Sequence, residues 1–288
     1  MIYLLLSITA STLIFVIFKL LGKFKINTLQ AIVVNYITAC FVGLIATDVK
    51  FSINDVIEAE WFTGAILLGF LFISIFNVMA LTAQRNGLSV SSVASKMSVI
   101  IPVVFGIYVY NESIGFQKLL GIIIALIAVY LTSVKKETKA NLKTNLWLPV
   151  ILFFGSGIID TSVKYIETTY VKEGGIPMFT ATIFGVGFII GLVLLAIQKL
   201  NGTLRFTPLS IIGGIILGIV NYCSMYYLLL ALNYKDLESS TLFTINNVAI
   251  VAISTLIGLL VFKEAISKTN WVGICLALVS IILVTLAI

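Results

Sequence analysis

The chain contains no histidine, and only 10% of its 288 residues are charged. Without histidine, Ser-His-Asp triads and imidazole acid–base chemistry are excluded, and the commonest transition-metal ligand is missing. The three cysteines, Cys40, Cys223 and Cys275, have neither metal-ligand spacing nor an obvious disulfide partner. We therefore predict no catalytic site, no metal site and no cofactor. The alternative, an intramembrane enzyme, would need a nucleophile with a base or a metal cluster.

Apolar residues dominate the composition. They make up 60% of the chain, and the mean hydropathy is +1.16. Soluble domains carry roughly 25% charged residues, so this chain has too little polar surface for water. A lipid bilayer supplies the missing solvent, and long apolar runs in lipid indicate helices. The net charge of +6 comes without a basic stripe interleaved with aromatic residues, so we predict no nucleic-acid partner.

Ten apolar segments, separated by short polar breaks, predict an all-α membrane protein with ten transmembrane helices. The predicted spans are Ile2–Leu21, Leu29–Thr47, Trp61–Ala83, Val90–Tyr110, Phe116–Val134, Leu146–Thr168, Ile176–Gln198, Leu209–Leu232, Ser239–Phe262 and Asn270–Ala287. The sizeable hydrophilic joint is the basic linker 135–145, which divides the chain into halves 1–134 and 146–288.

The two halves repeat one another. Glu112 follows an apolar span and precedes Gly121 by nine residues, and Glu264 precedes Gly273 by the same interval. The further matches occur in the same order: Ala80-Leu81 with Ala231-Leu232, Gly64 and Gly69 with Gly213 and Gly218, and Ser11 and Lys19 with Ser156 and Lys164. Because each half has five spans, the second half enters the membrane in the opposite orientation. The sequence thus predicts two inverted five-helix repeats, an arrangement common in secondary transporters.

The chain resembles the ten-span EamA-type permeases of the drug/metabolite transporter superfamily. The resemblance rests on two segments, NESIGFQKLLGIIIALIAVYL and KEAISKTNWVGICLALVSIIL, on the Ala-Leu pairs before the fourth and ninth spans, and on Pro102 within the fourth span. It covers essentially the whole chain and is nearly silent on substrate. It implies export or exchange of amino acids, related metabolites, nucleobases or toxic compounds through a central cavity. Ser254 replaces Pro102 in the ninth span, so a kink is expected in one half only.

Ionised residues inside the spans are candidate functional residues because they are costly in lipid. Asp160, about 14 residues into the sixth span, is a candidate coupling carboxylate or counter-ion of a substrate amine, and Lys164 and Glu167 share its helix face. The alternative is a structural Asp160–Lys164 pair. Lys96 in the fourth span could bind a substrate carboxylate or extend toward the near interface. Lys19 lies near the end of its span, where this extension is the favoured interpretation.

Neutral polar residues complete the predicted binding site. They are Asn77, Tyr222, Tyr226, Asn246 and Asn247, with Asn221 as a further amide. Such residues orient a small zwitterion or hold helices together. Glu112 and Glu264, the helix-end acids of the repeated motif, are expected to cap the helix that follows each of them. Gly213, Gly214 and Gly218 are expected to permit close helix packing.

Orientation predictions conflict. One face of the predicted topology carries eleven basic residues and the other four, which places both termini outside the cell, whereas the resemblance implies termini inside.

We predict a multi-pass secondary transporter of small metabolites in a bacterial inner membrane. The alternatives are a sugar or nucleotide-conjugate exchanger and a non-transporting membrane protein. The oligomeric state stays open, a homodimer included.

Overall fold

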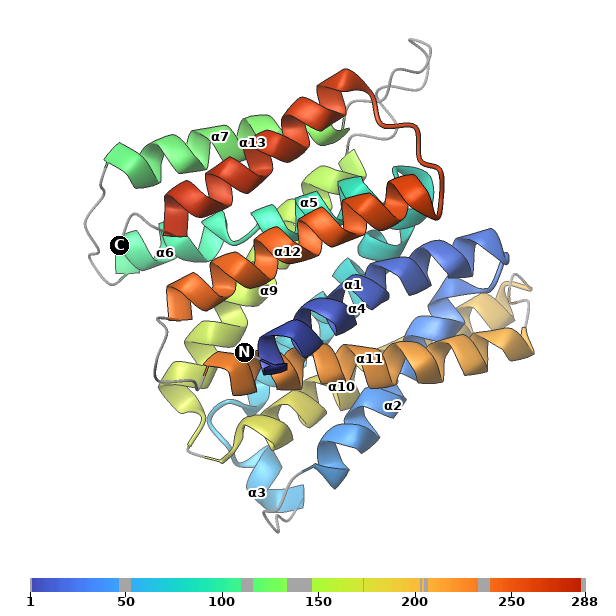
Figure 1. The fold of residues 1–288 in the computed structure, drawn as a ribbon. Helices are drawn as coiled ribbons and strands as arrows, with labels where there is room; N and C mark the ends of the chain where they lie inside the picture. Colours follow the sequence, from blue (N-terminus) through green and yellow to red (C-terminus); the bar gives the residue numbers. More distant parts are fainter. Residues whose placement is uncertain are drawn as a thin grey trace. The chain divides into compact units, whose positions relative to one another are not determined.

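A computed structural model of the chain describes residues 2–46, 53–109, 116–133, 147–172, 174–202, 204, 207–232 and 239–285. These ranges are helical and contain no β-strand (Figure 1). The helices are α1 (Ile2–Lys23), α2 (Thr28–Ile45), α3 (Ile53–Ile57), α4 (Phe62–Arg85), α5 (Leu88–Met97), α6 (Ile100–Val109), α7 (Phe116–Ser133), α9 (Trp147–Tyr170), α10 (Ile176–Leu200), α11 (Pro208–Leu232), α12 (Ser239–Leu260) and α13 (Lys268–Thr285).

Six of these helices are long and apolar enough to cross a membrane, namely α1, α2, α4, α9, α10 and α11. Shorter apolar helical stretches cover Leu88–Pro102, Leu119–Thr132, Asn246–Leu260 and Lys268–Leu283. Large apolar side chains such as Leu126, Ile189 and Leu256 are exposed on the outer faces of their helices. This is the surface of a multi-pass membrane protein, in which lipid covers the apolar faces that water cannot.

Most predicted spans correspond to one helix each, but the fourth does not. The predicted span Val90–Tyr110 begins at Leu88 and divides into α5 and α6. The sequence predicts a kink in one half only, at Pro102. This is confirmed, because α12 runs without a break through Ser254. The short helix α3 was not predicted. The linker 135–145 lies outside the described residues.

The chain forms two compact units, and each draws on both halves of the sequence. The first unit comprises Met1–Leu20, Val78–Ile158 and Cys223–Ile288, and the second comprises Leu21–Asn77 and Ile159–Tyr222. Compact packing therefore does not follow the division at the linker. The unit boundaries fall inside α1, α4, α9 and α11.

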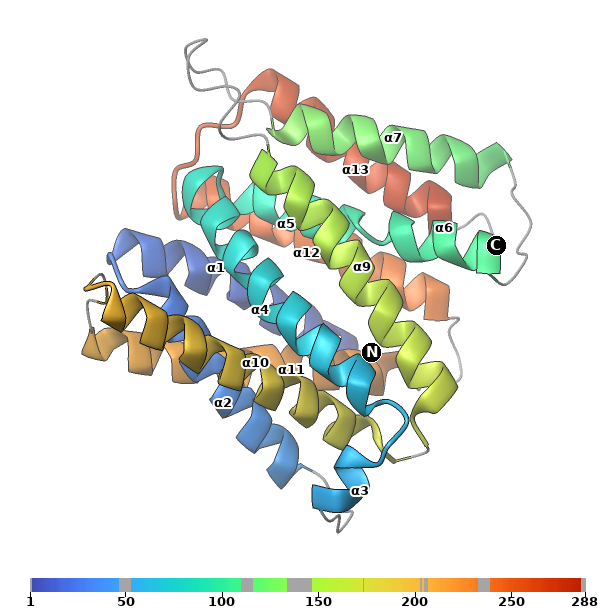
Figure 2. The ribbon, with the colours of Figure 1, turned by 180° about the vertical axis from the view of Figure 1, so that it is seen from behind.

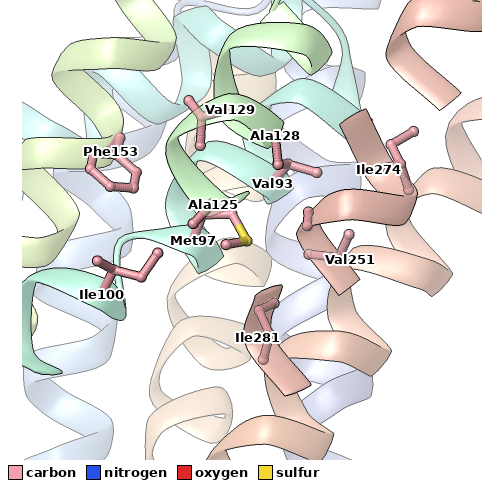
Figure 3. Close-up of a cluster of buried hydrophobic side chains, with 11 residues drawn as sticks. Val93, Met97, Ile100, Ala125, Ala128, Val129, Phe153, Val251, Ile274 and Ile281 are labelled. Atoms are coloured by element: carbon pink, nitrogen blue, oxygen red, sulfur yellow. The ribbon is translucent and has the colours of Figure 1, made fainter. Parts of the chain in front are cut away.

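The core of the first unit is built around α5, α7, α12 and α13. Figures 1 and 2 both show α7 and α13 side by side. Figure 3 shows the buried cluster that these helices share, whose members are Val93, Met97, Ile100, Ala125, Ala128, Val129, Phe153, Val251, Ile274, Ala277 and Ile281. Alanines at the α7–α13 contact let the two backbones approach, and the larger side chains fill the space towards α5 and α12.

The second unit packs α2 against α10 and α11 through glycines. A Cβ atom at Gly214 would lie 2.6 Å from the carbonyl oxygen of Ala31, and one at Gly218 would lie 2.7 Å from that of Asn35. A Cβ at Gly191 of α10 would lie 2.5 Å from the Val33 side chain. The expectation that Gly214 and Gly218 permit close helix packing is confirmed. At Gly213 the nearest atom, of Leu21, would be 3.0 Å away.

Candidate functional site

The break between α5 and α6 has a local cause. Pro102 has no N–H to donate to the carbonyl of Ser98, four residues earlier, and its ring would collide with that carbonyl in a continuous helix. The Ser98 carbonyl accepts instead from the N–H of Ile101 at 2.9 Å. The helix therefore ends at Met97 and restarts at Ile100.

Helix α5 is buried, yet it is unusually polar for a helix of such an apolar protein. Ser89, Ser91, Ser92 and Ser95 are all buried on it. Every face of this helix except that of Lys96 is enclosed. Apart from the side of Lys96, α5 is therefore surrounded by protein, and its hydroxyls need partners within the protein.

Two of these hydroxyls tie α5 to neighbouring elements. Ser254 of α12 donates to the Ser92 hydroxyl at 2.6 Å, and Ser92 donates in turn to the Ser89 carbonyl at 3.0 Å. The Ser91 hydroxyl donates to the carbonyl of Met79 in α4 at 3.1 Å. These bonds fix the rotation of α5 about its axis.

Lys96 lies in the last turn of α5, directly before the break, and is half-buried. It lies about 12 Å along the helix from Leu88. The negative end of the α5 dipole favours an ammonium group at this position. Lys96 thus lies at the C-terminal end of a short helix, next to the helix break.

The other end of α5 is capped by Glu264. One carboxylate oxygen accepts from the N–H of Leu88 at 2.8 Å, and the other lies 3.4 Å from the Ser89 hydroxyl. The prediction that Glu264 caps the helix that follows it in the chain is wrong. That helix, α13, is capped by Ser267 and Asn270, whose side chains accept from each other's N–H at 3.1 Å. Glu112 lies outside the described residues.

Lys19 is the ion-pair partner of Glu264. Its Nζ atom lies 2.9 Å from Glu264 Oε1, so the expected extension toward the membrane surface is replaced by an internal contact. A buried carboxylate without a partner would be strongly unfavourable, and a nearby ammonium group offsets that cost. The pair also links α1 to the chain segment after α12.

The two adjacent amides of α12 are both buried. Asn246 Oδ1 lies 3.3 Å from the hydroxyl of Ser7 in α1, which also lies 3.1 Å from the carbonyl of Ser224. Asn247 is 7% exposed. Tyr226 is exposed and its ring contacts that of Tyr227.

The remaining predicted site residues belong to the second unit. Asp160 and Lys164 are exposed on α9, and Glu167 is half-buried. The amide of Asn77 donates to the carbonyl of Ile73 in its own helix at 2.8 Å. Tyr222 is buried, and a Cβ at Gly43 would lie 3.2 Å from its ring. The described structure therefore assigns Lys96, Asn246, Asn247 and Tyr226 to one unit and Asn77, Asp160 and Tyr222 to the other.

Two sets of hydrogen-bonded side chains were not predicted from the sequence. Ser7 and Ser92 were not singled out, and Ser254 was named only as the counterpart of Pro102. The segment SVSSVASKMS, which contains Ser92, is an unusual composition for a membrane span. In the second unit, Asn221 donates to Asn35 Oδ1 at 3.2 Å. Asn35 lies alone in an apolar run, and its position there was the available signal.

These features define a helical membrane protein with a broken, hydroxyl-rich span. No family model matches the sequence. An uncharacterized protein of Haemophilus influenzae is 30% identical over 282 residues, which cover 96% of this chain and 94% of that protein. The chain belongs to the same family as this protein.

Proposed function

We propose that the protein is a secondary transporter of small metabolites, of the drug/metabolite transporter type that the sequence resembles. The observation that carries the proposal is the break between α5 and α6, with Lys96 immediately before it. Transporters commonly build substrate sites from discontinuous helices near the middle of the membrane, where free backbone groups and helix ends meet the substrate. A purely structural helix pair gains nothing from such a break.

The pairing of helices supports the inverted repeat on which the proposal rests. Under the predicted duplication, α2 corresponds to α10, α5 to α12 and α7 to α13, and each helix packs against its counterpart. The pairs are antiparallel: Ser89 lies near Gly258, and Ser92 bonds Ser254. Two copies related by a two-fold axis in the membrane plane require this arrangement. Together with the ten predicted spans, it supports the proposal of a carrier in a bacterial inner membrane.

The charge of the site favours a small carboxylate-bearing substrate, such as an amino acid or a related compound. Lys96 would bind the carboxylate. Asp160, which belongs to the second unit, is proposed separately as the residue that carries the coupling proton. The runner-up, a sugar or nucleotide-conjugate exchanger, would need several cations for phosphate. Lys19 is held by Glu264 at 2.9 Å, which leaves fewer lysines for that role.

Metabolite profiling tests the proposal. Cells overproducing the protein are compared with cells producing the Lys96→Ala variant, and metabolites are measured inside and outside. Lys23→Ala is the matched control, because Lys23 is an exposed lysine at the end of α1. We expect a small carboxylate to accumulate outside with the parent and the Lys23→Ala variant only. Equal profiles for the parent and Lys96→Ala, at equal protein levels, would contradict the role of Lys96.

The coupling role of Asp160 has its own test. Once the substrate is known, uptake into proteoliposomes is measured under a proton gradient for the parent and for Asp160→Asn. We expect the variant to lose the acceleration by the gradient while still exchanging substrate, because an amide cannot carry the proton. An unchanged pH dependence in the variant would exclude Asp160 as the coupling group.

A further inference from the structure

The Glu264 carboxylate occupies a cradle to which two helices of the first unit, α1 and α5, contribute polar groups. Lys19 of α1 contributes an ammonium group at 2.9 Å, and the first turn of α5 contributes the Leu88 N–H at 2.8 Å. The side chains of Lys19 and Glu264 are 21% and 12% exposed. An ion pair this enclosed is screened less by solvent and salt than a surface pair.

Two glycines leave the space that the carboxylate fills. A Cβ atom at Gly258 would lie 2.8 Å from Glu264 Oε2, and one at Gly87 would lie 3.0 Å from the same atom. Gly87 also has φ +111°, a conformation that other residues rarely adopt. As the residue before α5, it offers no side-chain cap of its own. The cap comes instead from Glu264, 176 residues after Leu88 in the chain.

The end of α12 directs Glu264 into this cradle. Lys263 has φ 51°, in the left-handed region that favours glycine. The N–H of Glu264 then donates to the carbonyl of Gly258 at 2.9 Å. The chain is thereby turned back over the last turn of α12, which brings the carboxylate beside α5. Because lysine adopts this backbone conformation at some cost, the contacts that it enables must compensate for it.

We propose that Glu264, oriented by Lys19, is the positioning residue of α5 and therefore sets the place of Lys96 at the other end of that helix. Helix α5 has only ten residues and is separated from α6 by the Pro102 break. A helix this short has little stability of its own, so its ends decide where it lies. The importance of Lys96 for substrate rests on the proposed function, whereas the anchoring of α5 does not.

Cysteine labelling tests the anchoring without a substrate. Cys40, Cys223 and Cys275 are replaced by alanine, and Lys96→Cys is introduced in the full-length chain in membranes. We measure its reaction rate with a water-soluble maleimide. Glu264→Gln removes the charge that pairs with Lys19, and loss of one charge-assisted hydrogen bond corresponds to about tenfold in an opening equilibrium. We therefore expect Glu264→Gln to raise the labelling rate about tenfold, and Glu264→Ala, which also removes the acceptor for the Leu88 N–H, to raise it further. Glu58→Gln, at an exposed carboxylate of the second unit, is the matched control.

A labelling rate unchanged from the parent in Glu264→Gln, in protein that remains folded by thermal unfolding, would overturn the proposal. Glutamine keeps an acceptor for the Leu88 N–H, so this variant stays informative even if alanine prevents folding. Lys19→Met should also raise the rate, whereas Lys23→Met, one turn further along α1, should not. Equal effects of the two lysine variants would contradict the role of Lys19.

Exchanging the charges separates the cap from the ion pair. Lys19→Glu combined with Glu264→Lys keeps opposite charges on α1 and on the segment after α12, but leaves the Leu88 N–H without an acceptor. We expect the labelling rate to stay raised in this double variant. Full restoration of the parent rate would show that the ion pair alone matters and would refute Glu264 as the cap of α5. Failure to find a transported metabolite would leave these labelling results unaffected.

Discussion

Asn270 of α13 donates its side-chain amide to the carbonyl oxygen of Thr132 at the end of α7, at 2.8 Å, and to that of Leu131 at 3.0 Å. The last carbonyls of a helix have no partner within it, so this amide supplies the missing donors. The approach is close because a Cβ at Gly273 would lie 2.7 Å from the Thr132 nitrogen. Gly273, the glycine of the second repeated motif, thus serves the contact between α7 and α13.

Asn270→Asp and Asn270→Ala should separate the two functions of this side chain. The Asn270 oxygen caps α13 by accepting from the Ser267 N–H, and aspartate keeps this cap while losing the donors to α7. We expect aspartate to destabilise the protein through repulsion from the Leu131 and Thr132 carbonyls, by about 1–3 kcal/mol. Alanine loses both functions but introduces no repulsion. Thermal unfolding in detergent measures both variants, and an aspartate variant as stable as the parent would contradict the interhelical role.

Close packing of α2 on α11 predicts a specific sensitivity at Gly218. In Gly218→Ala the new methyl group would lie 2.7 Å from the carbonyl oxygen of Asn35, a backbone atom that cannot move alone. Overpacking of this kind costs about 1–3 kcal/mol. Gly185→Ala is the control, because its Cβ would lie 3.6 Å from Cys40 Sγ, an ordinary contact. We expect a lower unfolding temperature for the first variant only, and equal temperatures for both would refute the interpretation.

The positions of the helices could be predicted because apolar length alone decides which segments enter a bilayer. Predicted and observed starts agree closely for the first span, at Ile2, and for the seventh, at Ile176. The break in the fourth span was predictable as well, since Pro102 removes a donor whatever the surroundings. Its exact place depended on the Ser98 carbonyl, which accepts from the Ile101 N–H instead of from residue 102.

The partners of polar side chains could not be predicted, because they depend on which helices meet. Glu264 and Leu88 are 176 residues apart, and nothing in the local sequence of either one indicates the other. From the local sequence, Glu264 was expected to cap the following helix. Ser267 and Asn270 cap that helix instead. Lys19 was likewise judged from its distance to the end of its span, whereas a carboxylate from elsewhere in the chain decided its contact.

The hydroxyl pair between α5 and α12 predicts a modest and non-additive effect on stability. Ser254→Ala removes the donor to Ser92, whose own hydroxyl still donates to the Ser89 carbonyl. Ser92→Ala leaves Ser254 with the Val251 carbonyl at 3.1 Å as an acceptor. We expect each single variant to cost about 0.5–1.5 kcal/mol, and the double variant to cost less than their sum. Strict additivity in thermal unfolding would indicate that the two hydroxyls do not interact.

Pro102→Ala tests whether the break between α5 and α6 serves function rather than stability. Alanine restores an N–H that can donate to the Ser98 carbonyl, and it removes a ring that opposes a continuous helix at a cost of about 3 kcal/mol. We therefore expect the variant to unfold at the same or a higher temperature than the parent. Export should fall, because Lys96 would then lie inside a continuous helix instead of beside a helix break. The two measurements, thermal unfolding and metabolite export, are made on the same preparation of cells, with Pro149→Ala as the control, because Pro149 lies near the start of α9. An export rate equal to that of the parent, in a variant with a raised unfolding temperature, would mean that the break is dispensable for transport.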